Sequence, residues 1–196
     1  MFHPDNQTGP AAITALPHRK GDRVDRLLGL AADTLRAAGL RVAGVVQRAR
    51  PGQAACCSDF YLEELASGTT FEISQRLGRE ARGCRLDYGG LAAAHAAVEQ
   101  SLNNGADALI LNRFGYSEAQ GHGLRPLIDL AVGREIPLLI SVNDTYRAEW
   151  QAFCGDFARD LTADRDSVAT WARQVCSASG IREDRHGQSQ TAHSFA

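Results

Sequence analysis

Ala108-Leu109-Ile110-Leu111-Asn112-Arg113 is the stretch that decides the fold. Its first four residues form an unbroken apolar run between Gly105 and Gly115, which is typical of a strand buried in a parallel sheet. The next two side chains are an amide and a guanidinium, whereas Mg²⁺ prefers carboxylate oxygens. We therefore interpret Arg113 as an anion-binding side chain at the end of a strand. A plain surface charge is the alternative.

Apolar strands and amphipathic helices alternate on both sides of this run. We expect strands at 11–16, 41–47, 108–111 and 137–142, helices at 23–38, 91–103, 124–132, 147–158 and 166–177, and a β-hairpin made of 60–65 and 70–75. This order predicts an α/β fold, with a mostly parallel sheet and helices on both faces. Ligands then bind in loops at the carboxyl ends of the strands. We expect these loops to begin at Pro17, Arg48, Asn112 and Asn143.

The chain is long enough for one domain of ordinary size. Of its 196 residues, 1–10 are polar and we expect them to be flexible, 11–178 to form a single α/β domain, and 179–196 to be a disordered tail without periodicity. The formal charge of -2 gives no sign of a nucleic acid partner. An apolar run of about 20 residues and an export signal are both missing, so we expect a cytoplasmic protein without a membrane partner.

The five cysteines do not follow a metal or disulfide pattern. Their number is odd and no C-x-x-C is present, which argues against a zinc ribbon or a disulfide framework. Cys154 and Cys176 stand among apolar residues and are interpreted as packed thiols. The roles of Cys56 and Cys57 stay open.

The loop after the first strand stands where a phosphate-binding P-loop would stand. That loop needs G-x-x-x-x-G-K-[ST], with glycines for converging N–H groups, a lysine for phosphate and a hydroxyl for Mg²⁺. Here Gly21 can replace the second glycine, but Asp22 replaces the lysine and Arg23 the hydroxyl. Lys20, Gly21 and Arg23 could form a non-standard anion loop at a helix N-terminus. An ordinary strand–helix turn is the alternative.

A second cluster of cations lies between the hairpin and the next helix. Arginines 76, 79, 82 and 85 surround Cys84 and are separated by glycines, so they do not form one helical face. Arginine suits oxyanions because its N–H donors form a planar fork. We expect Arg82 and Arg85 to converge with Arg113 on one anion, with Cys84 as a soft contact. A solvated charged loop is the alternative.

Several segments together resemble a known bacterial family. They are RVAGVVQR (41–48), LEELASG (62–68), ISQRLG (73–78), RGCRLD (82–87), LILNRFG (109–115) and IPLLISVNDTYRAEWQAFCGD (136–156). The chain from 11 to 171 resembles a family of unknown function that is grouped with the P-loop nucleoside triphosphatases and often encoded beside molybdate-uptake genes. The resemblance implies a fold like that of these triphosphatases, with degenerate nucleotide motifs and an inserted β-hairpin.

The expected function combines the resemblance with the arginines. We expect a non-hydrolytic protein that binds a small oxyanion, molybdate or tungstate, for molybdenum homeostasis or delivery, through Arg82, Cys84, Arg85, Asn112 and Arg113. One alternative is a divergent triphosphatase that binds a nucleotide through Lys20, Gly21 and Arg23. Another is a docking protein for molybdenum-enzyme assembly, with the β-hairpin as its contact surface. Catalytic and metal-ligating residues are not expected because the Mg²⁺ acid and the phosphate-loop lysine are missing. The oligomeric state stays open, with a homo-oligomer among the possibilities.

Overall fold

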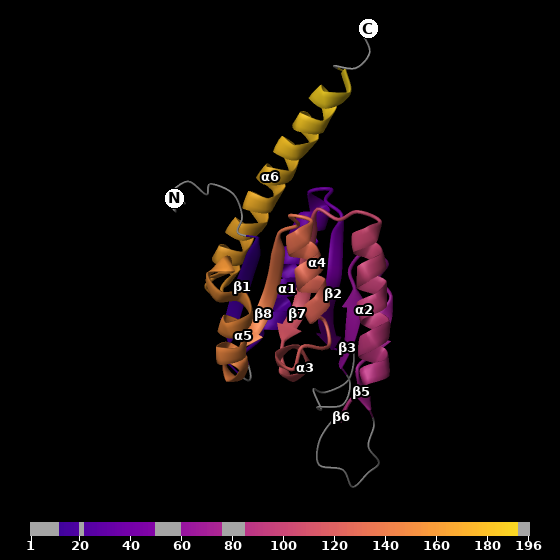
Figure 1. Cartoon of the computed structure of the whole chain (residues 1–196), viewed down its shortest axis with the longest axis vertical. Coiled ribbons are helices and arrows are strands. Elements are labelled where there is room, and N and C mark those ends of the chain that lie inside the picture. Colours follow the sequence, from indigo (N-terminus) through magenta and orange to yellow (C-terminus); the bar gives the residue numbers. More distant parts are fainter. Residues whose placement is uncertain (1–11, 20–21, 50–59, 76–84, 192–196) are drawn as a thin grey trace.

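The computed structural model describes residues 12–19, 22–49, 60–75 and 85–191 (Figure 1). The strands are β1 (Ile13–His18), β2 (Val42–Ala49), β3 (Phe60–Glu64), β4 (Thr70–Glu72), β5 (Ser74–Gln75), β6 (Arg85–Leu86), β7 (Ala108–Phe114), β8 (Leu138–Asn143) and β9 (Ala158–Asp160). The helices are α1 (Val24–Ala37), α2 (Tyr88–Asn103), α3 (Tyr116–Ala119), α4 (Arg125–Gly133), α5 (Arg147–Cys154) and α6 (Arg165–Thr191), with 3₁₀ turns η1 (Asp144–Tyr146) and η2 (Gly155–Phe157).

Seven of these strands form one sheet in the order β4-β3-β2-β7-β8-β1-β9. The strands from β2 to β9 in this order run parallel to one another. The predicted hairpin is β3 and β4, which extends the sheet antiparallel at the β2 side. β5 and β6 pair separately as a short antiparallel ribbon. The α/β class and the mostly parallel sheet are therefore confirmed.

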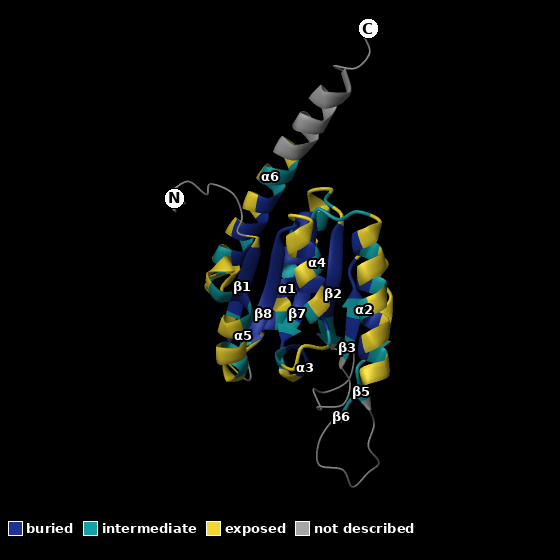
Figure 2. Ribbon diagram, in the orientation of Figure 1, coloured by how far each residue is buried: buried dark blue, intermediate teal, exposed yellow. Residues whose placement is uncertain are grey.

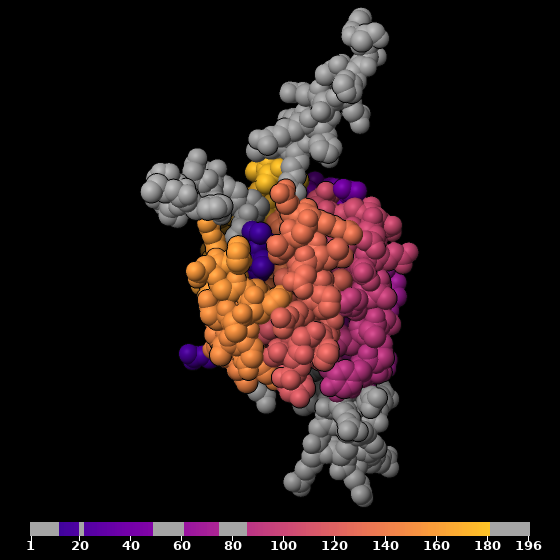
Figure 3. Space-filling model, viewed as in Figure 1, coloured from indigo at the N-terminus to yellow at the C-terminus, as the bar shows by residue number. Residues whose placement is uncertain are grey.

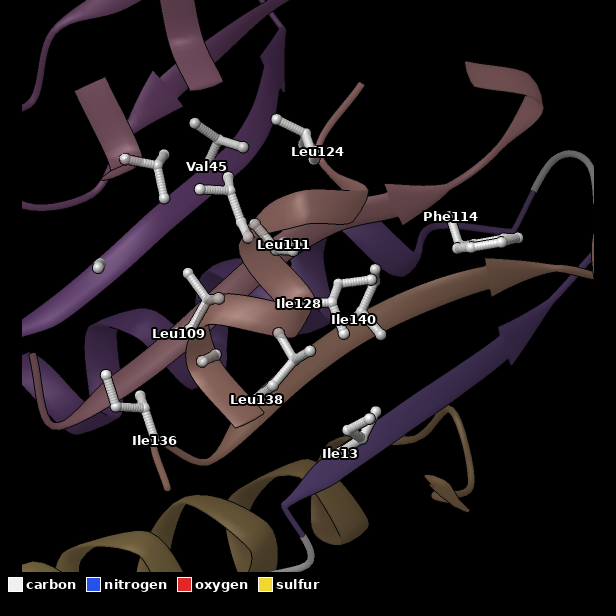
Figure 4. Close-up of a cluster of buried hydrophobic side chains, with 14 of the residues drawn as sticks. Ile13, Val45, Leu109, Leu111, Phe114, Leu124, Ile128, Ile136, Leu138 and Ile140 are labelled. Atoms are coloured by element: carbon white, nitrogen blue, oxygen red, sulfur yellow. The ribbon is translucent and has the colours of Figure 1, made fainter. Parts of the chain in front are cut away.

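Helices cover both faces of the sheet because the strands alternate apolar side chains between two core clusters. One cluster packs the sheet against α2, α4 and α5, and Figure 4 shows its central side chains, among them Leu111, Leu124 and Ile140. The other packs the opposite face against α1 and α6, through residues such as Leu28 and Trp171. Buried residues fill the strands, whereas exposed residues follow the outer sides of the helices (Figure 2). The helices α2, α4 and α5 cover most of their face of the sheet (Figure 3).

Gly44 lets β2 lie against β7. It pairs with Ile110 and has a φ of 125°, a conformation that residues with a side chain rarely adopt. A Cβ at this position would overlap with the carbonyl oxygen of Ile110. Glycine is therefore required in the middle of this strand.

The carboxyl ends of the parallel strands share one edge of the sheet, here called the carboxyl edge. Pro17 of β1 and Phe114 of β7 both stand in register with Val142 of β8, which confirms that these strand ends lie at the same edge. The strands extend further than predicted, however. Asn112 and Arg113 lie within β7 rather than in the loop after it. The apolar pattern ends at Leu111, but hydrogen bonding continues beyond it.

Further differences concern the C-terminal third of the chain. The helix predicted at 147–158 ends at Cys154, because Gly155 has a φ of 53°, and β9 follows as a strand that the sequence analysis missed. α6 extends to Thr191, into the segment 179–196 for which the sequence predicts no regular structure. Proline is absent from 165–191, so a helix is not interrupted there. Within the described ranges, none of the helices is long and apolar enough to cross a membrane.

Candidate functional site

A β-bulge sets the direction of the polar side chains at the end of β7. Leu109, Leu111 and Phe114 all belong to the same core cluster, although strict alternation would put residue 113 there instead. The register with β8 shifts between Leu111 and Phe114, and the buried hydroxyl of Ser141 donates to the carbonyl oxygen of Asn112. Such a bulge turns a side chain away from its regular direction. Phe114 thus takes the core position, and Arg113 lies beside the first turn of α1.

The side chain of Asn112 connects β7 to β2. Its side chain is 3% exposed, and its Oδ1 accepts a hydrogen bond from the backbone N–H of Gln47, at 3.0 Å. Its Nδ2 donates to Oε1 of Gln47, at 3.4 Å. The paired register of β2 and β7 ends at Gly44 and Ile110, so Asn112 continues the connection by its side chain. Asn112 also lines the cavity described below, and its part in ligand binding stays a prediction.

Arg113 donates hydrogen bonds to side chains of α1 and β2. Its Nη2 donates to Oδ1 of Asp25 at 3.2 Å and to Oε1 of Gln47 at 3.1 Å. Its Nε has no hydrogen-bond partner within the described ranges, although this atom is buried. The side chain as a whole is 40% exposed. Arg113 is thus a half-exposed cation at the carboxyl edge, partly balanced by an acid and with donor capacity left.

Gln47 and Asp25 are site residues that the sequence analysis missed. Gln47 is the polar residue that follows the apolar Val45-Val46 of β2, so its place near the end of a buried strand is the signal that could have found it. Asp25 stands in the first turn of α1, where an acid also favours the helix dipole. Because this role already explains an acid at that position, the sequence does not indicate its contact with Arg113.

The first loop is described only at its two ends. Lys20 and Gly21 lie outside the described residues. Arg23 is exposed directly before α1, and no side-chain hydrogen bond caps that helix. Oδ2 of Asp22 accepts a hydrogen bond from the backbone N–H of Arg19 at 2.7 Å. An exposed carboxylate therefore stands next to the helix N-terminus, where it opposes the binding of a triphosphate.

His18 is a buried polar side chain at the end of β1. Its residue is 6% exposed, its Nδ1 lies 3.2 Å from the carbonyl oxygen of Arg19, and its Nε2 has no partner in the described part of the chain. His18 is not among the predicted site residues. It lies at the carboxyl edge because it is the last residue of β1.

Most of the second arginine cluster lies outside the described residues. Arg82 and Cys84 belong to 76–84, so their predicted convergence with Arg113 is untested. Arg85 begins β6, and the following residue, Leu86, lines the same cavity as Arg113. The backbone at Arg85 therefore lies next to a wall of that cavity, and the convergence of its side chain with Arg113 stays a prediction.

This cavity lies at the carboxyl edge between α2, α3, β7 and the β5–β6 ribbon. Its volume is about 210 Å³. Its lining residues are Gln47, Leu62, Ile73, Leu86, Leu91, Asn112, Arg113, Gly115, Tyr116, Ser117, Glu118 and Leu124. The walls are mainly apolar, with a few polar side chains on the β7 side, which is the usual composition of a small-molecule site.

Two neighbouring polar residues of this wall differ in their hydrogen bonds. Glu118 is buried, and its two carboxylate oxygens accept from the backbone N–H groups of Gly115 and Leu124, each at 3.0 Å. This carboxylate therefore holds the loop after β7 in shape. The hydroxyl of Ser117 is buried as well, but it has no partner among the described residues. Ser117 is the second polar group of the cavity with unused hydrogen-bonding capacity.

Metal and thiol chemistry have little support in the described ranges. There, no group of three His, Cys, Asp or Glu side chains is placed to hold a metal ion. Cys154 is buried, as predicted, and burial raises the pKa of its thiol to about 12. Cys176 is only partly buried beside the α1–α6 core. Cys56 and Cys57 lie outside the described residues.

The fold is that of the nucleoside triphosphatases. The solution structure of a human cancer-related nucleoside triphosphatase superposes with a TM-score of 0.56, covering 85% of this chain and 96% of that one. The two sequences are 12% identical, so this likeness concerns the fold alone.

The family follows from sequence similarity. Residues 13–171 match the family described as "Protein of unknown function (DUF2478)", and the chain belongs to that family. It is also 33% identical over 176 residues to the molybdenum import ATP-binding protein ModC 2 of Bradyrhizobium diazoefficiens. That match covers 89% of this chain, which spans only about a fifth (20%) of the relative. The family membership that the sequence segments implied is thereby confirmed, and the likeness to a nucleoside triphosphatase concerns the fold.

Proposed function

We propose that this protein binds a small tetrahedral oxyanion, molybdate or tungstate, and does not hydrolyse nucleotides. The observation that carries the proposal is Arg113, a half-exposed cation at the carboxyl edge whose Nε has no partner among the described residues. Charge-assisted hydrogen bonds from a guanidinium suit such an anion. Leu86, the neighbour of Arg85 in the chain, lines the same cavity as Arg113, which supports a contribution from Arg85, Arg82 and Cys84.

The similarity to a protein named for molybdenum import supports the choice of anion. The proposed role is molybdenum homeostasis or delivery in the cytoplasm. The acid at the helix N-terminus and the amide of Asn112, which is bound to Gln47, argue against a magnesium nucleotide at this edge. A metal oxyanion needs neither a phosphate loop nor Mg²⁺.

Calorimetry with molybdate tests the proposal. Arg113→Ala should weaken binding by about 1.5–3 kcal/mol, the range for hydrogen bonds to a charged group. Arg173→Ala is the matched control, because Arg173 is exposed on α6 and donates to Thr170 of the same helix. Wild-type protein that binds neither molybdate nor tungstate, or an Arg113→Ala variant with unchanged affinity, would remove the proposed ligand.

Nucleotide binding is the second candidate, favoured by the triphosphatase fold and by the relative's name as an ATP-binding protein. Lys20, Gly21 and Arg23 would then hold phosphate next to α1. A rise in melting temperature with ATP or GTP, lost on Lys20→Ala but retained in Arg113→Ala, would support this candidate over the oxyanion. Docking to a molybdenum-enzyme assembly factor through the β3–β4 hairpin is a further proposal, as is association with a second copy of the chain.

A further inference from the structure

Much of the wall of the cavity at the carboxyl edge is apolar, and apolar walls do not contribute to binding a bare metal oxyanion. Five of its lining side chains are leucine or isoleucine, and they come from separate elements of the fold. They are Leu62, Ile73, Leu86, Leu91 and Leu124. Burial of apolar ligand surface against such walls is favourable, and an oxyanion without an organic part has no apolar surface to bury. The walls therefore point to an organic ligand.

The size of the cavity limits that ligand. An apolar cavity of about 150 Å³ can hold benzene, and drug-sized ligands need at least about 300 Å³. The observed volume of about 210 Å³ lies between them. It suits one six-membered ring with a small substituent. The exposed phenol ring of Tyr116 in the lining offers a face or an edge to such a ring.

The unused polar groups determine the substituent. The carboxylate of Glu118 is fully engaged with backbone N–H groups, and Asn112 is engaged with Gln47. Arg113 and Ser117 both line the cavity, and the guanidinium of Arg113 is half-exposed. Nε of Arg113 and Oγ of Ser117 are buried and have no hydrogen-bond partner within the described ranges. Two donors, one of them charged, call for a carboxylate or another small anionic group.

We propose that this cavity binds a small organic anion, with a single ring between the apolar walls and the anionic group on Arg113 and Ser117. The proposal rests on the anion-binding role of Arg113 and adds an organic acid, held by the apolar cavity, as a second class of ligand beside the bare oxyanion. It requires neither nucleotide nor metal.

Benzoate and benzamide are a matched pair of probes, because they share one ring and differ in charge. NMR titration of the ¹⁵N-labelled chain should show benzoate binding at millimolar concentrations or below, with benzamide weaker by about tenfold or more, as for the loss of a charge-assisted hydrogen bond. Ser117→Ala should weaken benzoate by a similar factor. Equal affinity for the two probes would overturn the proposal, because the anionic group would then contribute nothing.

Filling the cavity tests the location. Ile73→Trp puts a large ring at a half-buried position of the cavity wall and should abolish benzoate binding. Leu91→Phe is the second filling variant if Ile73→Trp does not fold. Ala66→Trp is the control, since Ala66 lines a cavity of about 200 Å³ beside Arg41 and Val42, at the opposite edge of the sheet. Benzoate affinity that survives filling, or that falls in the control, would overturn the proposal.

Molybdate titrated into the same samples separates this inference from the proposed function. Benzoate binding without molybdate binding would support the organic ligand and overturn the metal oxyanion. Molybdate binding without benzoate binding would do the reverse. Molybdate binding that remains in Ile73→Trp while benzoate binding is lost would support both.

Discussion

Nη2 of Arg113 lies 3.2 Å from Oδ1 of Asp25, so the end of β7 is tied to the first turn of α1. Both side chains are partly exposed, at 40% and 30%. The carboxylate balances the cation that the oxyanion proposal requires, and a ligand anion must compete with it. Removing the charge of Asp25 should therefore raise the affinity for the oxyanion, whereas removing Arg113 should lower it.

Asp25→Asn should strengthen molybdate binding, because the amide no longer neutralises Arg113. A partly exposed ion pair contributes up to about 1 kcal/mol, so the expected gain is roughly fivefold. Calorimetry at constant ionic strength measures it. Asp33→Asn is the control, with the same change of net charge on the same helix and a 4.0 Å contact to Arg36. Equal effects of the two substitutions would show that only overall charge matters.

The purified protein should release no phosphate from ATP or GTP above background in the presence of Mg²⁺. The physical reason is that the first loop has no lysine and hydroxyl at the phosphate-loop positions, and β7 has no acid at its end. Phosphate release over several hours measures this. Turnover near one per second, an ordinary enzymatic value, that disappears in Gly21→Val would contradict the prediction.

Gly44→Ala should reduce the free energy of unfolding by about 3–5 kcal/mol, since strained φ and overlap with Ile110 both add to the cost. Denaturant unfolding measures the loss. Gly133→Ala is the matched control, because a Cβ there meets nothing within 4 Å and Gly133 lies in α4. That variant should be equal to wild type or more stable by up to about 1 kcal/mol.

Glu118→Gln should destabilise the loop after β7 by about 2 kcal/mol, because the amide nitrogen would face a backbone donor, either Gly115 or Leu124. Chemical unfolding gives the magnitude, and hydrogen exchange at Leu124 gives the location. Glu149→Gln, on the exposed side of α5, should change stability by less than about 0.5 kcal/mol. A similar result for both variants would mean that the carboxylate does not hold this loop.

The buried thiol of Cys154 should make stability fall at high pH. Its pKa is raised from 9.0 to about 12 by burial, so the folded state keeps the proton longer than the unfolded state. The stabilisation is fully present below about pH 9 and is lost as pH rises towards 12. At pH 10.5 the loss amounts to roughly 2 kcal/mol. The difference in unfolding free energy between wild type and Cys154→Ala, followed from pH 8 to 11, measures it. A constant difference would contradict the assigned cause.

Much of the fold was predictable because its signals are local. Apolar runs such as 108–111 and 137–142 predicted buried parallel strands, and helical spacing predicted α1 within one residue at each end. β9 was missed because an edge strand of three residues, Ala158–Asp160, leaves too short a pattern, and its pairing with β1 is a tertiary contact.

The site was less predictable because its geometry depends on the bulge in β7. The sequence indicates that Asn112 and Arg113 follow an apolar run, but not that Phe114 returns to the core. That return places Arg113 beside Asp25, a residue far away in the sequence. The acid in the first turn of a helix has a sufficient local explanation, so nothing in the pattern indicated its partner. Convergence with Arg82 and Cys84 stays a prediction, since these residues lie outside the described ranges.

The order of strands in the sheet also has a consequence for the newly made chain. β1 is synthesised before the other strands, yet its neighbours in the sheet are β8 and β9: Ile13 pairs with Leu138 on one side and with Ala158 on the other. During translation, the apolar segment Ile13–Leu16 therefore has no strand to pair with until almost the whole domain has left the ribosome. Contacts so distant along the chain close slowly, and unpaired strands are prone to aggregate. The nascent chain should accordingly bind chaperones through β1 until β8 is available to cover it.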